Sequence, residues 1–588
     1  MASDFVQDPP ELENQYDRDR VLQSYIRRQF PESVLKTIEP ELVDLGEKAG
    51  GELYDLQQSD LDNEPTLAQW SPWGERIDEI EVTDVWKRAE TLAAERGIVA
   101  TAYEQEHGAH SRVHQMLLAY LFIPSTDMYG CPLAMTDGAV RTLLKSDNEA
   151  LADEAVPHLT SRDPDTFWTS GQWMTELTGG SDVGQSQTTA RQDDDGTWRL
   201  YGRRWFTSAI TADMALALAR PEGNPEGGKG LALFYVPIRD GDALRDGLHV
   251  NRLKDKLGTR KLPTAELELD GAAAHPVGEL QNGTRQISPM LNVTRMWNSV
   301  TAVALIRRGM ALARDYAQKR QAFGDDIINH PLHQETLADV QAIQEGNFHL
   351  ALRLAELMGA RETGEANTKQ NALFHILTPL IKLTTAKESV AATSELLEAF
   401  GGAGYVEDTG LPALHRDAQV LPIWEGTTNV LALELLRALR SVGSIAPLND
   451  EVKRCVKAIE APTLNEAIRP AVRAYRDAVK WLKGALNEGK DALEAGARRF
   501  ALTLGKSLEV LLTARHAQWS LRTEQDGRSA AAAERLAARK INHIADLDSH
   551  GSYVLVWDFN CPTLFDCHAQ GDGATADEPE IGSLTDVM

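Results

Sequence analysis

The stretch Leu421-Pro-Ile-Trp-Glu-Gly-Thr-Thr-Asn429 places a single carboxylate, that of Glu425, among apolar and small residues. Shortly before it comes the glycine-rich run Ala399-Phe-Gly-Gly-Ala-Gly-Tyr405, and far upstream lies Trp173-Met-Thr-Glu-Leu-Thr-Gly-Gly-Ser-Asp-Val183. Glycines in such runs allow the backbone to approach a ligand closely. We therefore predict that the three stretches meet around one site that contains Glu425.

The spacing of apolar residues changes twice around these stretches. It is helical from Thr83 to Leu144, apart from a predicted break at Gly130–Met135, after which a further helix is expected from Gly138. It becomes helical again from Arg285 to Arg440, where short connections predict a bundle of four or five long helices. Between these regions, short runs bounded by Gly, Asp and Asn predict strands at Thr197–Gly202, Ala215–Ala219, Leu231–Ile238 and Ala265–Leu269.

This order of elements predicts an α+β fold that is mainly α. We expect an N-terminal extension over 1–75 with a short helix near Arg18–Phe30, a helical domain over 76–168 and a β domain over 169–282. A helical bundle over 283–442 and a C-terminal helical extension with an acidic tail over 443–588 would follow. No Gly-x-Gly-x-x-Gly follows a strand, which argues against a doubly wound nucleotide-binding fold.

Composition limits the function classes. The 588 residues carry a net charge of −27, which disfavours nucleic acid and anionic membranes as partners, and no apolar run reaches the length of a membrane span. The N-terminus lacks the basic and apolar pattern of a secretory signal, and four scattered cysteines fit a reducing compartment, so we expect a cytoplasmic protein. Cys561, Cys567 and His568 match no zinc spacing, and we predict no metal.

Two motifs could hold a planar, phosphate-bearing cofactor. In Met174–Val183 the hydroxyls of Thr175 and Ser181 and the N–H groups beside Gly180 suit a phosphate or a flavin edge, although a plain turn would read the same. In Arg204–Ser208 an aromatic pair followed by two hydroxyls suits a heterocycle, although a buried strand is the alternative.

A third motif, Lys319–Gly324, ends a helix. Its Arg320 could pair with a phosphate through the planar guanidinium. Basic residues that complement the helix dipole, followed by a glycine cap, are the alternative reading.

Taken together and in this order, the motifs resemble the acyl-CoA dehydrogenase flavoproteins, and within them the AidB-like and longer branch. The resemblance covers residues 80 to 440. It implies an N-terminal helical domain, a middle β domain, a C-terminal helical bundle, bound FAD and a homotetramer. The matching residues are Met174, Thr175, Gly179–Asp182, Trp205–Ser208, Arg252–Gly258, Arg295, Arg320–Gly324, Phe400–Tyr405 and Ile423–Thr427.

The resemblance also implies site roles. Met174 and Thr175 would meet the flavin ring, Ser181 the pyrophosphate, Trp205 would shield the ring, and Thr207 would lie near flavin N5. Arg320, Phe323, Gly401 and Gly402 would hold the adenosine diphosphate half, partly across a subunit boundary. Asn429 stands where the family usually has Gln, which puts that contact in doubt. The predicted cofactor-binding residues are Met174, Thr175, Gly180, Ser181, Trp205, Thr207, Ser208, Arg320, Phe323, Gly401, Gly402, Thr427 and Asn429.

Glu425 occupies the position of the family's catalytic carboxylate. The α-proton of a thioester is weakly acidic, so its removal needs a positioned base of raised pKa, a polarised carbonyl and a hydride acceptor. Desolvation beside Trp424 and Ile423 raises the pKa of a carboxyl group, and the aligned Arg295 would oppose that rise. The alternative is a carboxylate that complements the start of a helix over Thr427–Leu439.

We therefore predict an FAD-dependent acyl-CoA dehydrogenase that converts a saturated, medium- to long-chain acyl-CoA to the trans-2-enoyl product. Electrons would leave through an electron-transferring flavoprotein or a similar acceptor. One alternative is a flavin-containing protein that sequesters a fatty acyl ligand. Another is an AidB-like, DNA-associated stress-response flavoprotein. Residues 451–540 hold 18 Lys and Arg against 11 Asp and Glu, a modest excess that a solvated helix face explains equally well.

Overall fold

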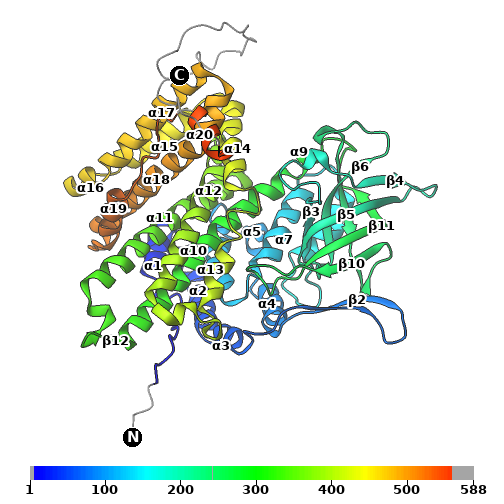
Figure 1. Cartoon of the computed structure of the whole chain (residues 1–588), viewed down its shortest axis with the longest axis horizontal. Coiled ribbons are helices and arrows are strands. Elements are labelled where there is room, and N and C mark those ends of the chain that lie inside the picture. Colours follow the sequence, from blue (N-terminus) through cyan, green and yellow to red (C-terminus); the bar gives the residue numbers. More distant parts are fainter. Residues whose placement is uncertain (1–5, 242, 548, 559–588) are drawn as a thin grey trace. The chain divides into compact units, whose positions relative to one another are not determined.

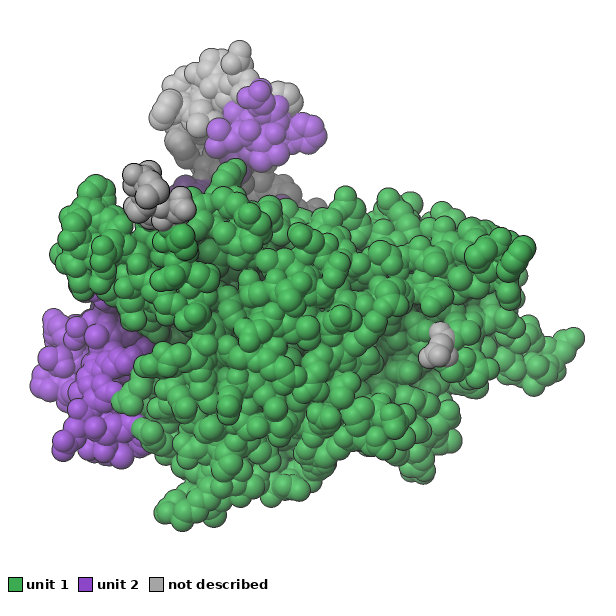
Figure 2. Space-filling view, turned by 90° about the horizontal axis from the view of Figure 1, so that it is seen from below, with its two compact units in different colours: residues 1–367, 385–427 green, residues 368–384, 428–588 purple. Residues whose placement is uncertain are grey.

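A computed structural model describes residues 6–241, 243–547 and 549–558. The chain divides into two compact units (Figure 2). Unit 1 comprises residues 1–367 and 385–427, and unit 2 comprises residues 368–384 and 428–588. The helical, β and helical order predicted above is the order along the chain (Figure 1).

The first part of unit 1 is helical with one hairpin. The hairpin β1–β2 crosses residue 75, where the sequence suggested a boundary, and the predicted short helix is α1. Asp19 caps α1 by accepting the N–H of Leu22 at 3.0 Å, and Thr83 caps α4 in the same way. The elements are α1 (Arg20–Gln29), α2 (Glu32–Gly50), α3 (Glu52–Ser59), β1 (Thr66–Trp70), β2 (Arg76–Glu81), α4 (Asp84–Glu95), α5 (Ala100–Glu104), α6 (His110–Phe122), α7 (Gly130–Leu143) and α8 (Glu149–Leu159).

The predicted break at Gly130–Met135 is wrong, because α7 begins at Gly130 and runs on to Leu143. Pro132 falls in the first turn, where its missing N–H has no helical partner to lose. A Cβ on Gly130 would lie 2.6 Å from the Ile123 side chain. The glycine therefore serves close packing here rather than ending a helix.

The middle of unit 1 is a seven-stranded sheet in the order β10-β11-β5-β4-β6-β3, with β7 paired to β6 and β11 (Figure 1). Its inward residues, including Trp173, Leu200, Phe234 and Leu267, form one buried cluster. The strands β5, β6 and β11 are longer than predicted, and β7 is one residue shorter at each end than the predicted Leu231–Ile238. The strands are β3 (Ser170–Trp173), β4 (Thr189–Gln192), β5 (Trp198–Ser208), β6 (Met214–Pro221), β7 (Ala232–Pro237), β10 (Leu248–Leu253) and β11 (Thr264–Pro276), with the small pair β8 (Arg239–Asp240) and β9 (Ala243–Leu244).

Long helices complete unit 1. The helix α10 packs against α7, and the indole Nε1 of Trp297 donates to Asp137 Oδ2 at 2.7 Å. Arg112 bonds both Asp137 and Glu362, so a buried polar cluster joins α6, α7, α10 and α11. The elements are α9 (Gly283–Gln286), α10 (Ser288–Lys319), β12 (Gln321–Ala322), β13 (Asp325–Asp326), α11 (Pro331–Glu362), the second half of α12 (Thr368–Ala399) and α13 (Leu411–Ala418).

Unit 2 is helical throughout its described part. It contains the first half of α12 and α14 (Thr428–Val442), α15 (Ala446–Lys457), α16 (Pro462–Ala467), α17 (Arg469–Glu488), α18 (Lys490–Thr523), α19 (Arg528–Ala538) and α20 (Ser549–Trp557). Most of the predicted acidic tail, with Cys561, Cys567 and His568, lies outside the described residues. Within the described ranges, no helix is long and apolar enough to cross a bilayer.

Candidate active site

Glu425 lies in the loop between α13 and α14, with an unusual backbone. Its φ is +56°, in the left-handed region that residues with a Cβ seldom adopt, and Gly426 follows at +99°. The Nε of Arg295, on α10, donates to the carbonyl oxygen of Glu425 at 3.2 Å. This bond helps to fix a strained loop that turns the half-buried Glu425 side chain toward α10 and β3.

Two neutral side chains hold the Glu425 carboxylate. The hydroxyl of Thr294, on α10, donates to Oε2 at 2.6 Å, and the amide of Gln172, on β3, donates to Oε1 at 3.4 Å. The same Gln172 amide lies 3.5 Å from the sulfur of Met174. The structure therefore brings β3, the start of α10 and the 421–427 loop to one place.

The neighbouring Trp424 is anchored to the same helix. Its indole Nε1 donates a short hydrogen bond to Asn298 Oδ1, one turn after Thr294 and Arg295. Thus residues 294, 295 and 298 of α10 hold both residues 424 and 425 of the loop.

Cys131, at the start of α7, interacts electrostatically with Glu425 and Lys256. Burial raises the pKa of the Cys131 thiol to about 12, so the thiol stays protonated near neutral pH. Burial lowers the pKa of Lys256 to about 8, and its ammonium donates to the Leu262 carbonyl and the Thr264 hydroxyl.

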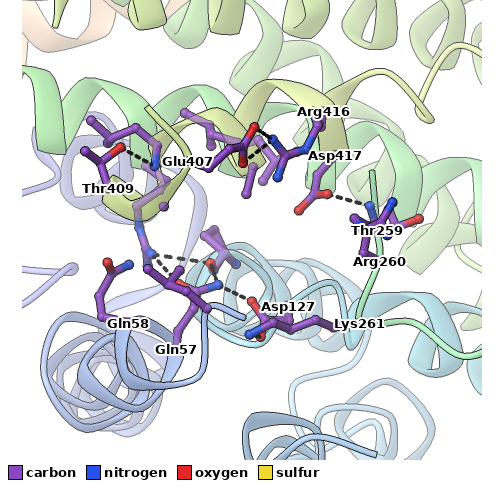
Figure 3. Close-up of a pocket in the computed structure, with 18 of the residues that line it drawn as sticks. Gln57, Gln58, Asp127, Thr259, Arg260, Lys261, Glu407, Thr409, Arg416 and Asp417 are labelled. Atoms are coloured by element: carbon purple, nitrogen blue, oxygen red, sulfur yellow. Dashed lines mark hydrogen bonds and ion pairs between the residues drawn. The ribbon is translucent and has the colours of Figure 1, made fainter. Parts of the chain in front are cut away.

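Lys256 also lines a cavity of about 540 Å³ among α3, the loop after β10, α10 and α13 (Figure 3). Lys261 faces Asp127 at 3.2 Å, and Asp417 accepts the Thr259 N–H at 2.5 Å. Burial raises the pKa of Asp417 to about 6. Ten acidic and basic side chains share this wall, which makes the cavity a poor match for an aliphatic tail.

A buried carboxylate organises the loop that follows β3. Glu176 accepts hydrogen bonds from the Ser186 hydroxyl, the N–H of Gln187 at 2.6 Å, and the N–H and hydroxyl of Thr188. Arg204, itself buried, pairs with it at 3.0 Å. Burial alone would raise the pKa of Glu176, but Arg204 and the loop donors outweigh it and lower that pKa.

The tip of this loop carries predicted cofactor residues. Gly180 and Ser181 are exposed, and Gly179 has a φ of +148° with open space beside it. A Cβ on Gly180 would lie 3.0 Å from the Thr175 hydroxyl. Because the loop is held at its base through Glu176, its glycines are presented in one conformation.

The strand β5 places the aromatic and hydroxyl residues. The N–H of Trp205 donates to the Thr175 carbonyl at 3.1 Å, and the Lys254 ammonium lies 3.3 Å from the centre of the Trp205 ring. The buried Thr207 hydroxyl donates to the Ala265 carbonyl at 2.7 Å, and the Ser208 hydroxyl lies 3.3 Å from that of Thr264. Trp205 is thus tied to Thr175, while Thr207 and Ser208 bond to β11.

A second group of predicted residues lies on exposed surface. Phe323 is fully exposed, and a Cβ on Gly401 or Gly402 would meet nothing within 4 Å. Tyr405 is 92% exposed. The segments that carry these residues share one apolar cluster, in which Tyr316 and Phe400 place their ring centres 5.3 Å apart.

Three further predicted cofactor-binding residues, Arg320, Thr427 and Asn429, lie outside these two groups. Arg320 donates to the Gln7 side chain at 3.3 Å. Thr427 is the last residue of this segment of unit 1. Asn429 belongs to unit 2, where it is exposed and accepts from Arg498 at 3.4 Å.

Sequence reasoning missed four side chains that contact predicted site residues. Gln172 could have been found from the strand period, since it shares a face with Met174 two residues later. Asn298 lies one helical turn after Arg295, and Thr294 directly precedes Arg295. No sequence pattern around Lys254 indicated a contact with Trp205.

The residues present fit a flavin nucleotide. The chain offers an open glycine tip with hydroxyls for phosphate oxygens, an indole beside it for a planar ring, and a separate exposed patch of glycine and aromatic residues.

Comparison with known proteins gives matches along most of the chain. Residues 7–166 match the adaptive response protein AidB N-terminal domain, 171–272 the acyl-CoA dehydrogenase middle domain, and 281–440 the acyl-CoA dehydrogenase C-terminal domain. Acyl-CoA dehydrogenase family member 11 of Caenorhabditis elegans is 41% identical over 531 residues, which cover 87% of this chain and 86% of that protein.

Solved structures agree with these matches. The structure of Caenorhabditis elegans ACDH-11 in complex with C11-CoA has a TM-score of 0.89 at 38% identity and covers 95% of this chain and 97% of that one. An FAD-complexed acyl-CoA dehydrogenase of Bacillus anthracis shares the fold, with a TM-score of 0.68 at 18% identity over 95% and 94% of the two chains. The chain therefore belongs to the acyl-CoA dehydrogenase family of flavin-dependent oxidoreductases that act on CH–CH groups.

Proposed function

We propose that this chain oxidises a saturated, medium- to long-chain acyl-CoA to the trans-2-enoyl-CoA, with Glu425 as the base that removes the α-proton. The observation that carries the proposal is the placement of Glu425 where β3, α10 and the 421–427 loop meet. The C11-CoA complex of the nematode relative supports the acyl-CoA class and this range of chain length.

The chain's own residues supply the proton transfer and its geometry. Arg295 holds the backbone of Glu425, and Asn298 holds the Trp424 indole beside it. The half-buried position of Glu425 favours a base strong enough to accept a carbon-bound proton. Together these contacts restrict the positions that the Glu425 oxygens can take, which favours their approach to the α-proton of a bound thioester.

FAD would be held by two groups of residues. Met174, Thr175, Gly180, Ser181 and Trp205 would contact the flavin and pyrophosphate, with Thr207 and Ser208 behind them on β5. Arg320, Phe323, Gly401 and Gly402 would hold the adenosine diphosphate half, with Thr427 and Asn429 as further candidates. When bound, the cofactor supplies the acceptor for the hydride that leaves Cβ.

The exposed Phe323 and Tyr405 support a site that a partner subunit completes, as in a homotetramer. An electron-transferring flavoprotein or a similar carrier would accept the electrons. Cys131 on α7 is a free thiol, which supports a reducing compartment such as the cytoplasm.

The test is anaerobic mixing of the yellow holoenzyme with acyl-CoAs of four to eighteen carbons. We expect bleaching of the flavin band with an optimum among the medium or long chains. Glu425→Gln should keep FAD and acyl-CoA binding but lose the bleaching, whereas Glu407→Gln, an exposed carboxylate paired with Arg416, should behave as wild type.

A panel in which every acyl-CoA binds and none bleaches the flavin would contradict the proposal. It would favour a protein that sequesters the acyl ligand. Loss of bleaching in Glu407→Gln as well would show that the effect of Glu425→Gln is not specific to the base.

A further inference from the structure

The two side chains that hold Glu425 share a chemical property. Thr294 donates to one carboxylate oxygen at 2.6 Å, and Gln172 lies 3.4 Å from the other. A hydroxyl can turn from donor to acceptor, and a primary amide carries both functions in one group. The immediate partners of the carboxylate thus suit both of its protonation states.

A second observation concerns Gln172 alone. Its Oε1 is buried, and no described residue donates to it. A buried acceptor without a partner costs free energy unless a donor reaches it in some state of the protein. In the proposed reaction Glu425 becomes a carboxylic acid, and the Gln172 amide, whose nitrogen now faces Glu425, can turn over so that its oxygen accepts the new O–H.

We infer that Thr294 and Gln172 are positioning residues that hold Glu425 both as the carboxylate that accepts the α-proton and as the carboxylic acid that results. The inference rests on the proposed role of Glu425. Before proton transfer, Thr294 and the Gln172 amide donate to the carboxylate. Afterwards the O–H of Glu425 donates to Gln172 Oε1 or to the Thr294 oxygen, and the proton stays on Glu425.

Titratable and charged groups from α10, α7 and the loop after β10 also lie near Glu425. On α10, Arg295 bonds the backbone carbonyl of Glu425. On α7, Cys131 is a neutral thiol because burial raises its pKa, and Lys256 from the loop after β10 acts on that thiol. On β3, the side chain that faces Glu425 is the uncharged Gln172.

The experiment compares Thr294→Val and Gln172→Leu with Thr294→Ser in the holoenzyme. Thr301→Val is the matched control, because Thr301 is also buried on α10 but bonds only its own helix, at the Trp297 carbonyl. The first readout is the infrared carboxyl band of Glu425, assigned by difference from Glu425→Gln and titrated with pH. The second is the pH profile of flavin reduction by acyl-CoA.

Loss of one hydrogen bond to a carboxylate should raise the pKa of Glu425 by about one pH unit in Thr294→Val. Reduction should slow about tenfold with little change in KM, since the carboxylate is then no longer held in position against the bound acyl-CoA. Thr294→Ser should restore both values, and Thr301→Val should change neither. Gln172→Leu should slow reduction even at high pH, where Glu425 starts as the carboxylate. The carboxylic acid that forms on proton transfer then lacks the Gln172 oxygen as an acceptor.

An unchanged infrared midpoint in both Thr294→Val and Gln172→Leu would overturn the inference, and so would equal effects in Thr301→Val. The proposed function fails separately, if wild-type flavin is not reduced by any acyl-CoA. The infrared titration still decides the inference in that case, because it needs no turnover.

Discussion

Substitution of Glu176 by Gln tests how the loop that carries Gly180 and Ser181 is held. The carboxylate accepts from Ser186, Gln187 and Thr188 and pairs with the fully buried Arg204 at 3.0 Å. An amide of the same shape keeps some of these bonds but leaves the Arg204 charge without a counter-ion. Removal of one partner from a buried pair costs about 3–5 kcal/mol.

This cost should appear in local opening of the loop, which takes less free energy than unfolding of the whole unit. We expect amide hydrogens of residues 176–190 to exchange about a hundredfold to a few thousandfold faster in Glu176→Gln, as followed by mass spectrometry. The affinity for FAD should fall in parallel, since the loop tip is no longer presented in one conformation. Glu222→Gln is the control, because its carboxylate pairs with Arg191 on the exposed surface.

The pH dependence follows from the lowered pKa of Glu176. A carboxyl whose folded pKa lies below its unfolded value of about 4.3 stabilises the fold above that value, and the stabilisation is lost as pH falls through the folded pKa. The wild-type loop should therefore open faster only in acid, while Glu176→Gln should be insensitive over that range. Wild-type protection and FAD affinity in Glu176→Gln would refute this account of the loop.

Lys254→Met should weaken FAD binding several-fold in a fluorescence titration, a loss of about 1–2 kcal/mol of binding free energy. The reason is that the Lys254 ammonium is largely buried and lies on the Trp205 ring. Asn298→Leu should slow flavin reduction about tenfold in stopped flow with FAD content unchanged, since the Trp424 N–H loses its acceptor. Glu90→Gln should stabilise the protein above pH 7 by about 3 kcal/mol in urea unfolding, and not below pH 4. Burial raises the pKa of Glu90 to about 7, so the folded state binds more protons than the unfolded state between these values and loses stability as pH rises.

Much of the fold could be predicted because hydrophobic periods are long and regular in the helices and in the sheet. Prediction failed at Gly130, where a glycine that packs against Ile123 looks in sequence like one that ends a helix. It also missed the hairpin β1–β2, because its strands are only five and six residues long and the apolar residues in TLAQW and RIDEIE do not alternate with polar ones.

Some residues of the site could be predicted from the sequence and others could not. Glu425 and Arg295 were found from family motifs, and the structure joins them by a backbone hydrogen bond. Thr294 could not be found, because an uncharged residue reveals its role only through what it touches in space, whereas the strand period that Gln172 shares with Met174 was a usable signal. Lys254 was hidden for a related reason, since its partner ring lies on another strand.

The left-handed backbone at Glu425 has a wider consequence. Glycine would relieve that position, whereas a β-branched side chain would find almost no allowed geometry, so only a narrow set of residue types can occupy it. The proposed base thus occupies a position where backbone preference and the proposed chemistry favour different residues. Attempts to redesign the reaction at residue 425 should begin from aspartate, asparagine or histidine, which tolerate the same turn, and leave the neighbouring Gly426 untouched.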